Sequence, residues 1–146
     1  MTELVAYRRE FLTGVSSGIC VLAGCMSEDE KKIRLGEIYM VNNQNQDAEI
    51  NVEIKKEGDK VYEETHMFAP VESGTAESIE IVDDSMGDPV YYDVSFDYIN
   101  NSFDTSYSTE DAENFVDEWG DDECFRLVAS IELDRINLAI AGMESC

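Results

Sequence analysis

From residue 33 onward, apolar residues follow a period of two far more than the helical period of 3.6. A strand turns successive side chains to opposite faces, so this period buries one face and leaves the other in water. The pattern constrains the fold most, because a helix does not place alternate residues on one face. The clearest example is an apolar stripe with acidic and hydroxyl side chains between its members: Val90, Tyr92, Val94, Phe96 and Tyr98.

Similar alternation predicts further strands along the rest of the chain. Turn-forming residues separate them about every 8–12 residues, as in Asn42–Asp47, Gly58-Asp59 and Asp83–Pro89. In about 110 residues, this spacing predicts an all-β, antiparallel β-sandwich of seven or eight strands. The predicted strands are residues 33–42, 50–55, 60–68, 79–82, 90–98, 103–107, 125–133 and 136–140.

One segment departs from the period of two. Ser108 or Thr109 provides an N-cap, and Gly120 fits the end of a helix. We therefore predict a short helix or helical loop over residues 110–119, crossing between strands. Its apolar residues stand at helical spacing: Ala112, Phe115, Val116 and Trp119.

Residues 1–25 follow neither pattern. Arg8 and Arg9 precede Phe11, which begins a run of 17 uncharged residues ending at Ser27. The run is rich in Gly, Ser and Thr and shorter than the roughly 20 apolar residues that span a bilayer. It matches the apolar region of an export signal, and the alternative is an N-terminal helix buried in a cytosolic protein.

Two motifs in this region resemble those of a known class of protein. The Arg8, Arg9, Phe11 and Leu12 pattern resembles the twin-arginine export motif, although Tyr7 and Thr13 depart from its usual flanking residues. Leu22, Ala23, Gly24 and Cys25 resemble a lipobox, whose cysteine is lipidated before cleavage. Together the motifs resemble the signal peptide of haloarchaeal twin-arginine-exported lipoproteins.

The resemblance implies a domain organisation and a location. Residues 1–24 are expected to be a removed signal peptide, residues 25–32 a polar tether, and residues 33–146 the β-sandwich. Two lipid chains on Cys25 would hold the protein firmly at the extracellular face of the cell membrane. The sandwich is similar, at the level of fold alone, to the immunoglobulin-like domains of haloarchaeal surface lipoproteins.

The charge agrees with a salt-loving source. The chain has 33 acidic and 10 basic residues, a net charge of −23, and residues 1–24 contribute nothing to it. At about 1 M salt the Debye length is only about 3 Å, so the self-repulsion nearly disappears. The alternative is an ordinary acidic protein. Such a surface argues against a nucleic-acid partner, which requires a basic face.

The cysteines predict one disulfide. Cys20 lies in the signal and Cys25 is the expected anchor, which leaves Cys124 and Cys146. Outside the cell these two are expected to form a disulfide around the last two strands, and the alternative is a pair of unpaired buried thiols. A catalytic thiol is not favoured, because no basic cluster surrounds either cysteine to lower its pKa.

Residues able to support other chemistry are few. His66 is the only histidine, so a blue-copper site lacks a ligand and a Ser-His-Asp hydrolase would have to use His66. Asn100 begins a glycosylation sequon on a predicted turn. Three residues of an acidic turn are weak candidates for Ca²⁺ ligands, and we favour a solvated acidic surface over a cation site there: Asp83, Asp84 and Asp88.

Three functions remain open at this stage. We favour a non-enzymatic interaction or envelope module with no cofactor, because the sequence lacks a catalytic constellation, and its expected partner is a surface protein. The second is a surface module that binds Ca²⁺ or a small solute through acidic loops. The third is a hydrolase that uses His66. The sequence gives no oligomeric state.

Overall fold

The computed structural model describes residues 33–72, 74–119 and 124–146, with residues 116–119 described by their backbone alone. The predicted signal peptide, lipobox and tether lie outside these residues, and so does Cys25. In the part that is described, no helix is long and apolar enough to cross a membrane.

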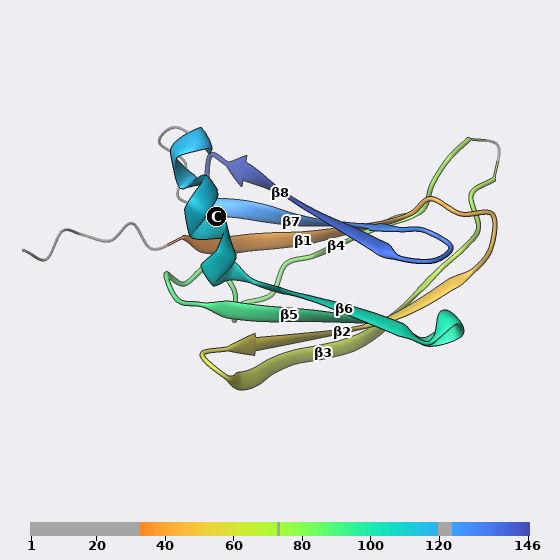
Figure 1. The fold of residues 1–146 in the computed structure, drawn as a ribbon, viewed down its shortest axis with the longest axis horizontal. Helices are drawn as coiled ribbons and strands as arrows, with labels where there is room; N and C mark the ends of the chain where they lie inside the picture. Colours follow the sequence, from red (N-terminus) through yellow and green to blue (C-terminus); the bar gives the residue numbers. More distant parts are fainter. Residues whose placement is uncertain (1–32, 73, 120–123) are drawn as a thin grey trace, which may run out of the picture. The chain divides into compact units, whose positions relative to one another are not determined.

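The described residues contain eight strands and two 3₁₀ helices. Figure 1 labels the strands in chain order. The first four strands are β1 (Arg34–Asn42), β2 (Ala48–Lys56), β3 (Asp59–Phe68) and β4 (Ser78–Ile81). The others are β5 (Tyr92–Tyr98), β6 (Phe103–Ser108), β7 (Cys124–Ile131) and β8 (Ile136–Met143). Helix η1 (Ile99–Asn101) follows β5, and η2 (Thr109–Trp119) joins β6 to β7.

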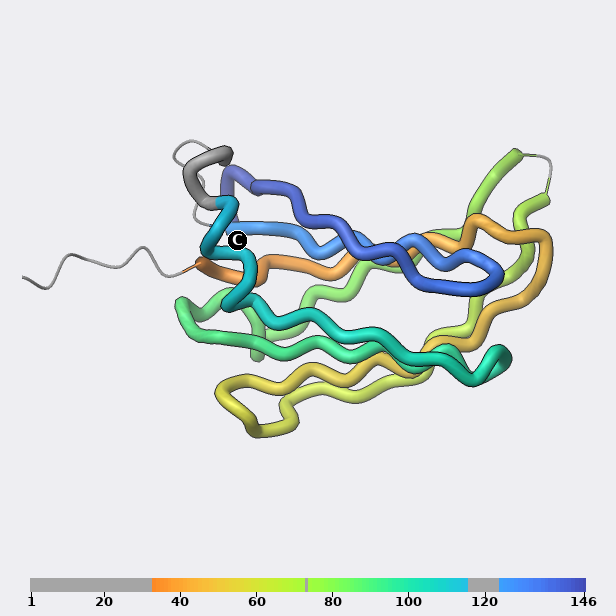
Figure 2. Tube along the Cα trace, viewed as in Figure 1, coloured from red at the N-terminus to blue at the C-terminus, as the bar shows by residue number. Residues whose placement is uncertain are grey.

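The strands form two four-stranded sheets that pack face to face, which confirms the predicted all-β sandwich. The first sheet has the order β4-β1-β7-β8 and the second has the order β3-β2-β5-β6. Figure 2 traces the chain as it passes repeatedly from one sheet to the other. Every pairing is antiparallel except that of β1 with β7, which is parallel.

The core lies between the sheets and follows the alternation seen in the sequence. In β5, Tyr92, Val94, Phe96 and Tyr98 are fully buried, whereas the acidic residues between them are exposed. The strand begins at Tyr92 rather than at Val90, because the N–H of Val90 closes a turn on the carbonyl of Asp88.

The predicted helix over residues 110–119 is present as η2, wound as a 3₁₀ helix. Ala112 is its buried apolar contact. The hydroxyl of Thr109, which the sequence offered as a cap, instead accepts a hydrogen bond from the backbone N–H of Tyr92 at 2.8 Å. That bond fixes the start of η2 against β5.

The outer faces of the two sheets differ in charge. On the second sheet, the outward positions of β2, β3, β5 and β6 carry many acids and two lysines: Glu49, Glu53, Glu63, Asp93, Asp97, Asp104, Lys55 and Lys60. On the first sheet, the charged outward residues balance: Arg34, Arg126, Glu37 and Glu80. Among the outward strand positions, the excess of acids therefore lies on the second sheet.

Candidate functional site

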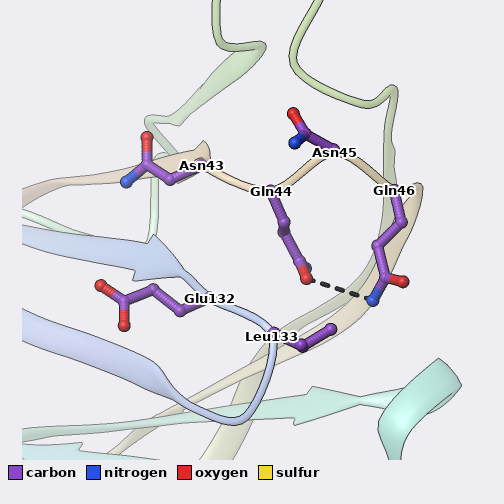
Figure 3. A pocket seen from close by; sticks show the side chains of 6 residues that line it. All are labelled: Asn43, Gln44, Asn45, Gln46, Glu132 and Leu133. Carbon is purple, nitrogen blue, oxygen red and sulfur yellow. Dashed lines mark hydrogen bonds between the residues drawn. The ribbon is translucent and has the colours of Figure 1, made fainter.

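A pocket of about 380 Å³ lies where the β1–β2 connection meets the turn between β7 and β8 (Figure 3). The two segments meet because β1 and β7 are paired up to Asn42 and Ile131, so the residues that follow both strands leave the sheet side by side. The lining is rich in side-chain amides: Asn43, Gln44, Asn45, Gln46, Glu132 and Leu133.

Hydrogen bonds between amides hold the β1–β2 connection in place. Asn42 is fully buried, and its Nδ2 donates to the carbonyls of Gln46 at 3.0 Å and Ala69 at 2.9 Å. Its Oδ1 accepts from the N–H of Gln44 at 3.2 Å. Gln44 is also buried, and its side chain contacts the hydroxyl of Tyr98. The buried amides thus hold the backbone of the pocket.

The rest of the lining is available to a ligand. Asn43 and Asn45 are exposed, and Leu133 is 63% exposed beside them. Gln46 donates to Gln44 Oε1 at 3.2 Å, the dashed line of Figure 3. Amides both donate and accept hydrogen bonds, and Arg135 and Asn137 engage the carboxylate of Glu132, so the pocket suits a neutral polar ligand. The sequence predicts a turn at these residues, and the signal of a polar pocket is the run of five amide residues from Asn42.

His66 lies in a second polar cluster, on the inner face of β3. The Tyr62 hydroxyl is 3.0 Å from His66 Nε2 and donates to Glu64 at 2.9 Å. Burial raises the pKa of Tyr62, and its bond to Glu64 raises the pKa further. Within the described ranges, no serine is hydrogen-bonded to His66. The contacts tie His66 to Tyr62 at the open edge of the second sheet.

The acidic turn between β4 and β5 does not bring its carboxylates together. Asp83 accepts from the N–H of Ser85 at 2.9 Å, and hydrogen bonding by Ser85 lowers the pKa of that carboxyl. Asp88 forms an ion pair with Lys56, and Asp84 is exposed. Over residues 33–72, 74–119 and 124–146, no three acidic, histidine or cysteine side chains gather in a way that could hold a metal ion.

Asn100 lies in η1 and is exposed. Its Oδ1 accepts a hydrogen bond from the N–H of Glu49 at 2.8 Å. A glycan would be attached through the other atom of the amide, Nδ2, so this bond does not block attachment. Glycosylation at Asn100 stays a prediction.

The predicted disulfide is present. Cys124 and Cys146 are joined with their Cα atoms 5.5 Å apart, and the bond ties the C-terminal residue to the outer face of the first sheet. Gly36 in β1 leaves room for it: a Cβ added there would lie 2.5 Å from Cys124 Sγ. The predicted pairing of the two cysteines is therefore confirmed.

A buried acidic residue lies close to the disulfide on the same face. Glu37 is 6% exposed and forms an ion pair with Arg126, whose guanidinium carbon is 5.8 Å from the centre of the Tyr39 ring. Without the arginine, a carboxylate would be left in a poorly hydrated position. Removing Arg126 is therefore expected to destabilise the fold, because the buried carboxylate of Glu37 would lose its ion-pair partner.

Replacing Arg126→Ala is expected to lower the free energy of unfolding by about 1–2 kcal/mol, less than for a fully buried pair because the arginine is 42% exposed. Denaturant unfolding in molar salt measures this change. Adding Glu37→Gln is expected to recover part of the loss, and Arg34→Ala on the same face serves as the control. Equal losses for Arg126→Ala and Arg34→Ala would contradict the role of the pair.

Comparison of the chain with protein-family models, with curated proteins and with solved structures gives no match. Its function is therefore inferred from its own residues and geometry.

Proposed function

We propose that the chain is exported in folded form, anchored by a lipid on Cys25 at the outer face of the membrane of a salt-adapted cell, and acts there as a non-enzymatic interaction module. The β-sandwich is the part presented to the surroundings, and the tether separates it from the membrane. The export motif and lipobox are as described for residues 8–12 and 22–25.

The disulfide is the observation that carries the proposal. Disulfides persist in oxidising compartments outside the cytoplasm and are rare inside it. The bond between Cys124 and Cys146 crosslinks the C-terminus to β7, so it belongs to the folded domain. A folded domain with such a bond supports a location beyond the membrane, the same location that the N-terminal motifs imply.

The surface charge supports the salt-adapted setting. Asp97 and Asp104 stand directly opposite each other on β5 and β6, whereas Lys60 bridges the opposed Glu53 and Glu63 on β2 and β3. Like charges facing across a strand pair are destabilising unless they are screened or bridged. In molar salt the screening length is shorter than the spacing between such groups, so this face is tolerated.

The contacts of the candidate sites favour binding over catalysis. The amide pocket offers hydrogen-bonding groups, and the inward polar cluster pairs its histidine with Tyr62. The Ca²⁺ alternative gains no specific support, because Asp83 and Asp88 are engaged by Ser85 and Lys56. An interaction module is the function that these surfaces support best.

Replacing Cys25→Ser in a haloarchaeal host is expected to release the protein from the membrane fraction, because the lipid contributes about 0.8 kcal/mol for each buried CH₂ group. Cell fractionation with an antibody to the sandwich measures the distribution. The matched control is Cys20→Ser, which alters a cysteine of the same signal and is expected to leave the protein membrane-bound.

A second variant separates export from anchoring. Replacing Arg8→Lys together with Arg9→Lys is expected to keep the chain in the cytoplasm with its signal uncleaved. Retention of the Cys25→Ser chain at the membrane, in the same amount as the Cys20→Ser chain, would contradict the anchor. Efficient export of the double lysine variant would contradict the twin-arginine route but not the lipid anchor.

A further inference from the structure

One end of the sandwich holds most of the amide side chains of the chain. Eight of the ten Asn and Gln residues lie there, at residues 42–46, Asn100, Asn101 and Asn137, and the other two are Asn51 and Asn114. Elsewhere the polar surface is mainly acidic, since the chain has 33 acids. A carboxylate only accepts hydrogen bonds, whereas an amide also donates them. The composition of this end therefore indicates a ligand that needs donors as well as acceptors.

Hydrogen bonds to other parts of the fold fix both walls of the amide pocket. On the β1–β2 connection, the carbonyl of Gln44 accepts from the N–H of Val71, which follows β3, at 2.8 Å. On the turn between β7 and β8, the carbonyl of Leu133 accepts from Nδ2 of Asn101, in η1, at 2.6 Å. A ligand would therefore enter a largely preformed site, which lowers the entropic cost of binding.

The remaining polar groups of the pocket can bind hydroxyl groups. Asn43 and Asn45 are exposed, and their side chains have no hydrogen-bond partner among the described residues. The carboxylate of Glu132 accepts one bond on each oxygen, from Arg135 at 3.0 Å and from Asn137 at 2.7 Å. Each oxygen can accept one more. The pocket therefore offers free donors and acceptors, and its one carboxylate is paired with an arginine.

We propose that the amide pocket binds one neutral saccharide unit. A saccharide hydroxyl both donates and accepts hydrogen bonds, so it can satisfy the free amides and donate to Glu132. The side chain of Leu133, 63% exposed, would contact the aliphatic face of the sugar ring. The volume of about 380 Å³ is in the range of small-molecule sites. Molar salt screens the ion pairs that a charged ligand would need, whereas these hydrogen bonds do not depend on net charge.

The position of the pocket favours a saccharide in the surroundings over one on a membrane lipid. Arg34 begins β1 where the chain enters the sandwich, and Asn42 ends the strand beside the pocket. The nine residues of β1 span about 30 Å. With Cys25 anchored, the pocket lies at the end of β1 remote from the entry of the tether. The inference rests on the proposed function in this respect alone, because the pocket itself does not require the anchor.

Nuclear magnetic resonance titration of the full-length chain in about 1 M salt tests the proposal. The probes are glucose, galactose, mannose and N-acetylglucosamine, each as the free sugar and as the methyl glycoside, and N-acetyl-triglycine amide as a neutral peptide. The expected result is a Kd on the order of 1–10 mM for at least one saccharide, with shifted resonances at residues 43–46 and 132–133. Tighter binding of the glycoside than of the free sugar supports a glycan-linked unit, and the reverse supports a free sugar.

Two results overturn the proposal. One is the absence of these shifts for every saccharide at about 100 mM, well above the expected Kd. The other is tighter binding of the peptide than of any saccharide, which would assign the pocket to a different ligand. No membrane is present in the titration, so a failed saccharide test leaves the anchor standing. Failure of the anchor in cell fractionation likewise leaves the saccharide test valid.

Replacing Asn43→Asp together with Asn45→Asp removes both free amide donors at constant side-chain size and is expected to weaken saccharide binding about tenfold or more. The matched control is Asn114→Asp, the same change at an exposed position of η2, which follows the end of β6 remote from η1. This control is expected to bind as the wild-type protein does. Circular dichroism verifies that both variants fold. Equal binding by the two variants overturns the assignment to this pocket.

Discussion

Transfer of the protein from about 1 M salt to about 0.01 M is expected to lower its melting temperature by about 10 °C or more, because the Debye length grows from about 3 Å to about 30 Å. The net charge of −23 then repels itself across the whole domain. Thermal unfolding followed by circular dichroism at several salt concentrations measures the effect. Sucrose in place of salt controls for stabilisation by solute exclusion, which does not screen charge.

The salt dependence of stability can also be tested at one pair of opposed acidic residues. Asp104→Asn removes one partner of the Asp97–Asp104 pair and is expected to raise stability by about 0.5 kcal/mol at low salt and by nothing measurable in molar salt. Asp134→Asn is the control, since Asp134 is exposed beside Arg135 and opposes no acid in a ladder. A melting temperature that is independent of salt would contradict adaptation of this surface to high salt.

Replacing Cys146→Ser is expected to lower the free energy of unfolding by about 3 kcal/mol, the chain-entropy estimate for a loop of this size. The disulfide spans 22 positions of sequence and pins the end of the chain that follows β8. Denaturant unfolding of the variant and of the wild-type protein measures the loss. A further sign is faster hydrogen exchange in β8, which no longer has a crosslink beside its end.

The control for this second prediction is the wild-type protein in a reducing agent, which is expected to match the Cys146→Ser variant. A chain with Cys124→Ala and Cys146→Ala separates loss of the bond from exposure of a lone thiol. Unfolding midpoints that are the same with and without reductant would show that the bond contributes nothing to stability.

Much of the fold was predictable because its signals are local. The alternation from Tyr92 to Tyr98 shows by itself which residues of that strand face the core. The β2–β3 hairpin follows from the turn at Gly58. The disulfide was predictable because Cys124 and Cys146 were the two cysteines left outside the signal. These inferences depend on period, turn chemistry and residue counts, none of which requires knowledge of distant contacts.

The order of strands was not predictable in the same way. The parallel pairing of β1 with β7 joins residues about 90 positions apart, and no turn between them sets its register. The amide pocket depends on that register, since it brings Asn43 next to Glu132. The turn composition of residues 42–47 was visible in the sequence, but the second wall of the pocket was not.

The Tyr62–His66 contact was predictable only in part. The period of two already places Tyr62, Glu64 and His66 on one face of a strand. Which face this is depends on the pairing of β3 with β2, where His66 stands opposite Ile50. The polar residues therefore line the inner face at an open edge, a position that only the assembled sheet defines.

Mass spectrometry of the protein purified from the membrane fraction of its own cells is the most direct test of the surface anchor. A chain whose first residue is Cys25, carrying the added mass of two lipid chains, is the predicted result. A chain that still begins at Met1, has an unmodified Cys25 and is recovered from the cytosol would contradict it.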